Sequence, residues 1–139
     1  MKRVLCLLVA LMILVSVSPA YALEVQTPYD EEITLFYAHT RAVRADISVS
    51  SGTATCTGSA TSIQSGNTVS ITVTLQRKSG SSWVNVSSWS ISEKGYAGLS
   101  KTKSLTRNNT YRVTTTAQIK NGSGVVLENA SATSNPYTY

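Results

Sequence analysis

Apolar and hydroxyl side chains alternate strictly along residues 69–75. The segment reads VSITVTL, so that every second residue is apolar and each residue between is Ser or Thr. Side chains alternate between the two faces of a strand, whereas a helix repeats its faces every 3.6 residues or so. The segment can therefore bury one apolar face only as a β-strand, with its hydroxyls turned to solvent.

Similar segments recur along the chain and are separated by short turns. The turns contain Ser51-Gly52, Ser79-Gly80-Ser81-Ser82 and Asn121-Gly122-Ser123-Gly124, all residue types that favour chain reversal. The expected strands are residues 45–50, 54–60, 69–75, 83–91, 96–105, 111–119 and 125–133. About seven strands at such short intervals predict an all-β domain, an antiparallel β-sandwich.

The first 22 residues have the pattern of a secretory signal peptide. A basic Lys2-Arg3 pair precedes the apolar stretch Val4 to Val15, and Ala20-Tyr21-Ala22 provides a small-x-small cleavage site. The apolar stretch is short for a membrane span and no second one follows, so we expect no membrane span in the mature chain. The predicted mature protein begins at Leu23 and is secreted into the extracellular space.

The sequence therefore divides into three predicted regions. Residues 1–22 are the predicted signal peptide, residues 23–43 an acidic leader that we expect to be partly ordered, and residues 44–139 the sandwich domain. In the leader, Thr27-Pro28 has the chemistry of a helix start, while residues 33–37 suit a strand equally well. We expect Phe36 or Tyr37 to dock on the sandwich.

Positive charge is concentrated behind the leader. Residues 41–139 contain ten basic side chains and three acidic ones, a net excess of 10 − 3 = 7 positive charges. A domain with this excess of positive charge attracts anionic polymers. Scattered Lys and Arg side chains can also serve simply to keep the protein surface soluble. The electrostatic candidates are Arg77, Lys78, Lys101 and Lys103.

The mature chain keeps a single cysteine, because Cys6 lies in the predicted signal peptide. One cysteine cannot form an internal disulfide, so the core alone has to stabilise the domain. Cys56 could pair between chains or react as a free thiol. Its place in the alternating segment TATCTG favours instead an inert, buried side chain.

The segment Asn109-Thr110-Tyr111-Arg112-Val113 resembles the penultimate strand of immunoglobulin-like and fibronectin-type sandwiches. In those domains the hydroxyl of an early tyrosine bonds back to a nearby backbone group. The resemblance implies this role for Tyr111 and an immunoglobulin-like β-sandwich as the fold. Antibody-type domains carry a cysteine two residues after that tyrosine; here the position is Val113, and Cys56 lies where the partner cysteine would fall.

Four further segments resemble those of small secreted proteins of Gram-positive bacteria. These are SVSSGTATCTGS at 48–59, VTLQRKSGSSW at 73–83, SSWSIS at 87–92 and TYRV at 110–113. Such proteins carry one β domain after a signal peptide and are largely uncharacterised. The resemblance implies a bacterial secreted protein with a non-catalytic role, and it assigns no binding residue.

Catalytic and metal-binding patterns are weak in this sequence. His39 is the only histidine, and its spacing from Cys56 resembles no known catalytic or zinc pattern. The carboxylates available for glycoside hydrolysis behind the leader are Asp46, Glu93 and Glu128, and we expect Glu93 to face solvent in a turn of residues 92–95. We therefore expect no enzymatic activity, no metal and no cofactor.

Trp83 and Trp89 are the best candidates for ligand binding. In a regular strand both indoles would share one face, with Val84 and Val86 on the other, and could form a flat platform for sugars or a protein. Alternatively, a bulge at Ser87-Ser88 turns at least one indole inward, leaving Trp89 buried and Trp83 partly exposed. Tyr96 is a further candidate ligand contact.

The expected function is that of a secreted, non-catalytic interaction module that binds a protein or an anionic cell-envelope polymer. One alternative is a carbohydrate-binding module that uses Trp83, Trp89 and Tyr96, with a glycan as its partner. Another is a structural surface protein that self-associates through an exposed edge strand. We expect no nucleic-acid partner.

Overall fold

The computed structural model describes residues 37–139, and the regular structure in this range consists of β-strands without a helix. The predicted signal peptide and the leader up to residue 36 lie outside the described residues. The strands are β1 (Thr40–Ser50), β2 (Thr53–Ser62), β3 (Thr68–Ser79), β4 (Ser82–Lys94), β5 (Tyr96–Ser104), β6 (Thr110–Lys120), β7 (Val126–Thr133) and β8 (Tyr137–Thr138).

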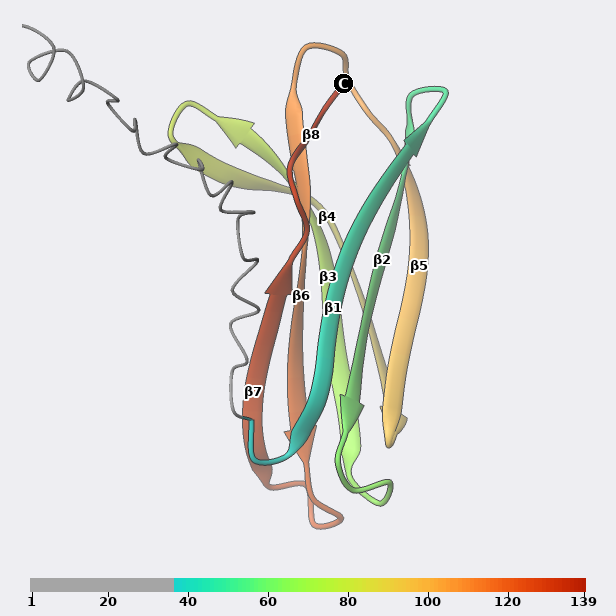
Figure 1. Cartoon of the computed structure of the whole chain (residues 1–139), viewed down its shortest axis with the longest axis vertical. Helices are drawn as coiled ribbons and strands as arrows, with labels where there is room; N and C mark the ends of the chain where they lie inside the picture. Colours follow the sequence, from blue (N-terminus) through green and yellow to red (C-terminus); the bar gives the residue numbers. More distant parts are fainter. Residues whose placement is uncertain (1–36) are drawn as a thin grey trace, which may run out of the picture. The chain divides into compact units, whose positions relative to one another are not determined.

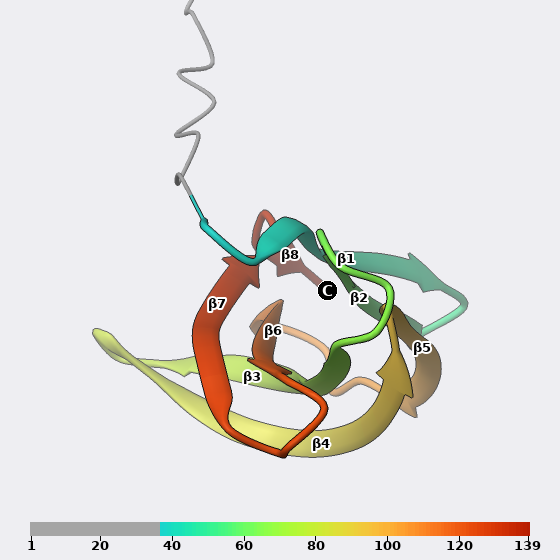
Figure 2. The same cartoon turned by 90° about the horizontal axis from the view of Figure 1, so that it is seen from below.

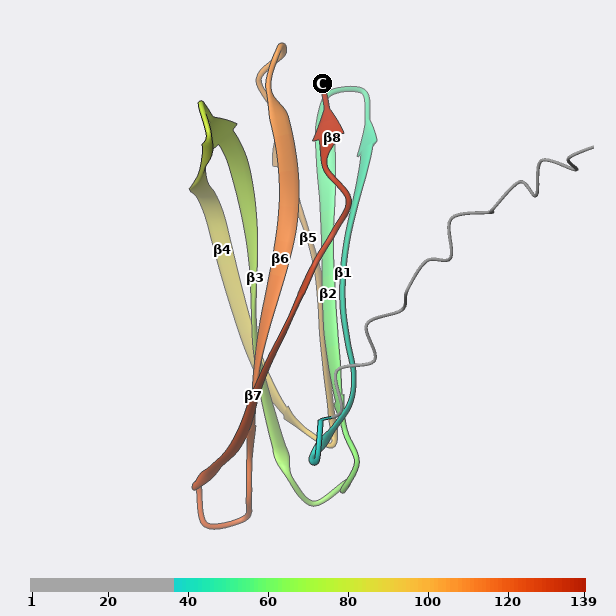
Figure 3. The ribbon, with the colours of Figure 1, turned by 60° about the vertical axis from the view of Figure 1, so that its left-hand side comes forward.

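Two antiparallel sheets face each other (Figures 1 and 2). One sheet has the order β1-β2-β5, and the other has the order β4-β3-β6-β7, with the short β8 pairing with β6. In Figure 3 the first sheet stands beside the second, and β7 crosses obliquely at its edge. The predicted all-β sandwich is confirmed, with seven long strands and one very short one.

The alternation in the sequence sets the two faces of each central strand. In β3, Val69, Ile71, Val73 and Leu75 are at most 1% exposed, while the residues between them are only partly buried. The central strands β2 and β6 show the same alternation and complete the core. A strand that alternates in this way can occupy the middle of a sandwich sheet with one wet face.

Small residues on β2 allow the two sheets to approach closely. The inward positions of this strand hold Ala54, Cys56, Gly58 and Ala60, all of them buried. A Cβ atom added to Gly58 would collide with the side chains of Val73 and Thr115 in the opposite sheet. Glycine within a strand often marks such a close approach, and here it sets the spacing of the core.

The tyrosine contact implied by the immunoglobulin-like resemblance is present. The Tyr111 hydroxyl donates to the carbonyl oxygen of Thr106 at 3.1 Å and accepts from the Thr106 amide at 3.0 Å. Tyr111 is buried at the start of β6, and Cys56 is a free, buried cysteine on β2. The sandwich therefore keeps the tyrosine corner and, within residues 37–139, forms no disulfide.

Most strands extend beyond their predicted bounds, and two of the differences affect the ends of the sheets. The first strand begins at Thr40 rather than at residue 45, and Glu128 on β7 binds the chain where this strand starts. The expected turn at residues 92–95 is shorter, since β4 continues to Lys94 and only Gly95, with φ of 72°, separates it from β5. Glu93 is exposed, as expected.

Between residues 37 and 139 there is no helix with the length and apolar character to cross a membrane.

We predict that Gly58→Ala destabilises the domain by about 2 kcal/mol, because the added methyl group overpacks the contact with Val73 and Thr115. Chemical denaturation measures the free energy of unfolding. The matched control is Gly122→Ala in the β6–β7 turn, where an added Cβ meets no atom within 4 Å. Equal stabilities of the two variants would contradict the close approach of the sheets.

Candidate functional site: the basic end of the sandwich

One end of the sandwich gathers most of the positive charge. Cross-strand register puts the end of β3 beside the start of β6, and the Leu105 amide donates to the Gly52 carbonyl oxygen at 2.8 Å, which joins the β5–β6 loop to the β1–β2 turn. This end also receives the C-terminus (Figure 1, top). We call it the basic end, and it carries Arg77, Lys78, Lys101, Lys103, Arg107 and Arg112.

Two of the three acidic side chains of the sandwich lie at the opposite end, and the third borders the basic end. Glu93 and Glu128 pair with residues at the far ends of β3 and β6, while Asp46 lies opposite Thr57, one register position from the row that holds Cys56 and Lys101. The remaining basic residues, Arg41, Arg44, Lys94 and Lys120, share the opposite half with Glu93 and Glu128. Among residues 37–139, the basic end therefore has six cationic side chains and no Asp or Glu within it, with Asp46 at its border.

Four polar and aromatic side chains form one network on the outer face of the β4-β3-β6-β7 sheet. The guanidinium carbon of Arg112 lies 4.2 Å from the centroid of the Trp83 ring. Arg112 Nε donates to Gln76 Oε1 at 2.9 Å, and Gln76 Nε2 donates to Asn85 Oδ1 at 2.9 Å. Arg112 is thus held in place by one hydrogen bond and one cation–π contact.

A bulge in β4 separates the two tryptophans. Leu75 pairs with Ser87 and Gln76 pairs with Asn85, so the ladder skips Val86. Trp89 pairs with Val73 and packs partly buried against the core, whereas Trp83 pairs with Lys78 on the outer face. The predicted inward turn of Trp89 is observed, with the extra residue at Val86 instead of Ser87-Ser88.

The shared indole platform is therefore not formed. Val84 and Val86, which a regular strand would have buried, are 40% and 38% exposed. Tyr96 lies on β5 in the other sheet, where it is 56% exposed and its hydroxyl end covers Gly98. Of the three aromatic candidates, only Trp83 belongs to the basic end.

The four electrostatic candidates all lie at the basic end, in two pairs. Arg77 and Lys78 end β3, in a hairpin that projects to the upper left in Figure 1. Lys101 and Lys103 lie opposite Cys56 and Ala54, on the side of β5 that faces the other sheet, and both are exposed at its open edge. Inward-pointing charges on an edge strand also discourage edge-to-edge pairing with another chain.

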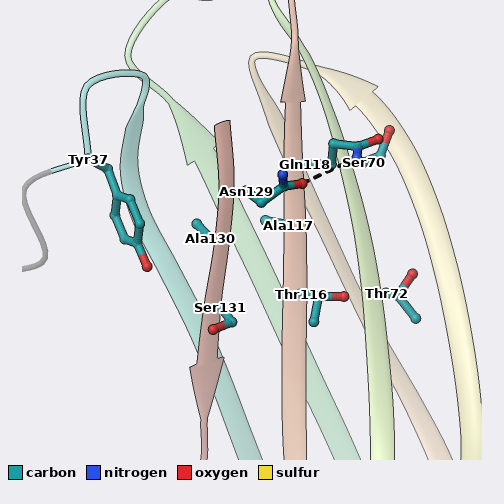
Figure 4. A pocket seen from close by; sticks show the side chains of 9 residues that line it. All are labelled: Tyr37, Ser70, Thr72, Thr116, Ala117, Gln118, Asn129, Ala130 and Ser131. Atoms are coloured by element: carbon teal, nitrogen blue, oxygen red, sulfur yellow. Dashed lines mark hydrogen bonds between the residues drawn. The ribbon is translucent and has the colours of Figure 1, made fainter. Parts of the chain in front are cut away.

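A second surface feature was not anticipated from the sequence. An open hollow of about 520 Å³ lies over β3, β6 and β7 (Figure 4). Hydroxyl and amide side chains line it together with the Tyr37 ring, and Gln118 Nε2 donates to Asn129 Oδ1 at 3.2 Å. The alternating Ser and Thr positions were the available signal, but the sequence does not show that three strands place them around one hollow.

Glu128 holds the chain where it enters β1. Its carboxylate accepts hydrogen bonds from the Ala38 amide at 2.8 Å, the His39 amide at 3.1 Å and the Thr40 hydroxyl at 2.5 Å. Desolvation raises the pKa of the Glu128 carboxyl, but these hydrogen bonds together outweigh it and leave the pKa below its ordinary value. Glu128 is thus engaged in a structural contact.

The other candidates for chemistry are dispersed. His39 contributes its carbonyl oxygen to the Ile63 amide at 2.9 Å, and no group of three or more His, Cys, Asp or Glu side chains among residues 37–139 could hold a metal ion. Burial raises the pKa of the Cys56 thiol to about 11. At neutral pH this cysteine is a thiol rather than the nucleophilic thiolate.

No known protein family matches the sequence, and no characterised protein matches it significantly.

Cys56 should resist alkylation in the folded protein, because it is buried and protonated. In a Cys6→Ser background, we predict that iodoacetamide leaves Cys56 unmodified at pH 8 and modifies it after unfolding, as followed by mass spectrometry. Ser81→Cys, in the exposed β3–β4 turn, is the matched control and should react at once. Comparable rates at both positions in the folded protein would contradict the burial of Cys56.

Glu128→Gln should destabilise the domain by about 1 kcal/mol at pH 7, because an amide replaces a hydrogen-bonded carboxylate at a partly exposed site. A lowered folded-state pKa contributes stability above the unfolded-state pKa, and this contribution is lost as pH falls through the folded-state value. The stability difference should therefore be constant from pH 6 to 8 and shrink below about pH 4. Thermal unfolding across this range measures it, and a difference independent of pH down to pH 2 would contradict the carboxylate contact.

Proposed function

We propose that the protein is a secreted, non-catalytic module that binds an anionic cell-envelope polymer through its basic end. The observation that carries the proposal is the separation of charged side chains: among residues 37–139, six cationic side chains and no Asp or Glu lie at one end of the sandwich. The pattern of residues 1–22 supports export, which would place the domain where such polymers are found.

The fold allows the six charges to act together on a long ligand. They come from the β3–β4 hairpin, from β5, from the β5–β6 loop and from the start of β6. Adjacent strands of one sheet are about 4.8 Å apart, so Lys78 and Arg112, on the same face of β3 and β6, lie close to the screening length of about 8 Å at physiological salt. A flexible polyanion can contact several of the six charges at once, and its attraction should weaken as salt rises.

Carbohydrate binding without charge is a second candidate, and the hollow beside Tyr37 favours it. Its lining is rich in hydroxyl and amide groups and contains no ionisable side chain apart from Tyr37 itself. Such a surface suits the hydroxyls of a neutral sugar, with the tyrosine ring as an apolar contact. Binding at this hollow would be insensitive to salt, which distinguishes it from binding at the basic end.

Charge neutralisation at each end of the sandwich tests the proposal. One variant replaces Arg77, Lys78, Lys101 and Lys103 by Gln, and its matched control replaces Arg41, Arg44, Lys94 and Lys120 by Gln. Both variants lose four positive charges and so have the same net charge. We expect the first to lose at least about tenfold in affinity for isolated cell-wall polyanion at low salt, and the control to lose about twofold.

Retention of the protein on purified cell walls, measured from low to high salt, supplies the affinities. Equal losses in the two variants would show that only net charge matters and would overturn the assignment to the basic end. Retention that persists unchanged at 1 M salt would exclude the electrostatic mechanism. A wild-type protein that binds duplex DNA as tightly as the wall polymer would contradict the choice of an envelope polymer.

A further inference from the structure

We infer that the pair formed by Arg112 and Trp83 makes the basic end selective for acidic polysaccharides, that is, for sugar rings that carry a carboxylate or another oxyanion. This inference rests on the proposed function, because it names the ligand class of the same end. Binding by charge alone does not require the tryptophan and the two amides, Trp83, Gln76 and Asn85, that lie among the cationic side chains of this end.

Arg112 is oriented before any ligand arrives. Its Nε atom donates to Gln76 Oε1, and its guanidinium carbon lies 4.2 Å from the Trp83 ring centroid. Within residues 37–139, the Nε bond is the only hydrogen bond that the Arg112 side chain donates. Its two terminal nitrogens therefore remain available as the fork that binds a planar oxyanion through two parallel hydrogen bonds.

Gln76 holds the Arg112 guanidinium in this orientation through its side-chain amide. Its amide accepts from Arg112 through Oε1 and donates to Asn85 through Nε2, so both ends of the amide are used. The row Asn85, Gln76, Arg112 runs across β4, β3 and β6 on one face of the sheet. A guanidinium fixed in this way loses little conformational entropy when it binds, which favours a specific contact over a diffuse one.

The neighbouring positions suit the remainder of a sugar. Trp83 pairs with Lys78 on the same face, which adds a second cation beside the indole. The hydroxyls of Thr110 and Thr138 lie 3.0 Å apart on the exposed outer face of β6 and β8. The part of the half-buried indole that Arg112 does not cover offers an apolar surface to the C–H groups of a sugar ring, while lysine and hydroxyl groups can bind its substituents.

A polyanion without sugar rings would make no use of the indole. Inorganic polyphosphate presents charge along its whole length and needs only point charges, which the lysines of this end supply. An acidic sugar presents an oxyanion beside an apolar ring, and because the guanidinium of Arg112 stacks over one face of the Trp83 ring, an oxyanion bound to Arg112 would place its sugar next to the indole. The two ligands should therefore respond differently to changes in Trp83.

Three probes separate charge from sugar in the test. Polygalacturonate carries both, its methyl ester keeps the sugar and loses the charge, and inorganic polyphosphate keeps the charge without a sugar. We expect the wild-type protein to bind polygalacturonate, and to bind its methyl ester at least about tenfold more weakly, because the ester lacks the oxyanion that Arg112 would bind.

The variants are Trp83→Leu, which removes the ring, and Arg112→Lys, which keeps the charge and removes the planar fork. Each should weaken polygalacturonate binding by about tenfold and leave polyphosphate binding within about twofold. Lys101→Gln is the matched control at the same end, and it should weaken both ligands alike. Trp83→Tyr should restore binding, and protection of Cys56 from alkylation verifies that each variant is folded.

The outcomes distinguish the two proposals. If the wild-type protein binds neither polygalacturonate nor polyphosphate, the proposed function is contradicted. If it binds polygalacturonate and polyphosphate but Trp83→Leu weakens both equally, the basic end stands and the selectivity for acidic sugars is overturned. Binding of the methyl ester as tightly as polygalacturonate would also overturn it, since recognition would then not involve the oxyanion.

Discussion

The close approach of the two sheets at Gly58 is the constraint on which the rest of the domain depends. The sandwich has no disulfide within the described residues, so its stability rests on packing between faces of small and β-branched side chains. The absence of a side chain at Gly58 lets Val73 and Thr115 come forward. The hydroxyl of Thr115 at this contact is buried and has no hydrogen-bond partner among residues 37–139, which costs free energy that the packing around it has to offset.

The regular pairing of β3 with β4 places polar side chains in cross-strand pairs on the outer surface of the sandwich. On the outer face of β3 and β4, the hydroxyls of Ser70 and Ser92 lie 2.6 Å apart, and those of Thr72 and Ser90 lie 2.8 Å apart. The same cross-strand pairing continues into Gln76 and Asn85 and then reaches Arg112 on β6. The proposed binding network is thus the continuation, at the basic end, of the ladder that covers the whole face.

Much of the fold could be predicted from local sequence, because period-2 alternation and turn residues act over a few positions. The strand at 69–75 is an example, whereas the role of Tyr111 was implied by the resemblance to immunoglobulin-like sandwiches. For Trp83 and Trp89 the sequence left two alternatives open, a shared face or a bulge that turns Trp89 inward, because the bulge at Val86 depends on how β4 pairs with β3. Likewise, the sequence shows an excess of charge, but only the strand order brings Arg77 and Arg112 to the same end as Lys103.

The most direct test of the central claim is an amide and indole chemical-shift map of the protein titrated with polygalacturonate at low salt. Binding at the basic end predicts the largest shifts at the Trp83 indole and at Gln76, Lys78 and Arg112, and their loss as salt is added. Shifts confined to Asn129, Ser131 and Tyr37 at the hollow, or unchanged by salt, would contradict it.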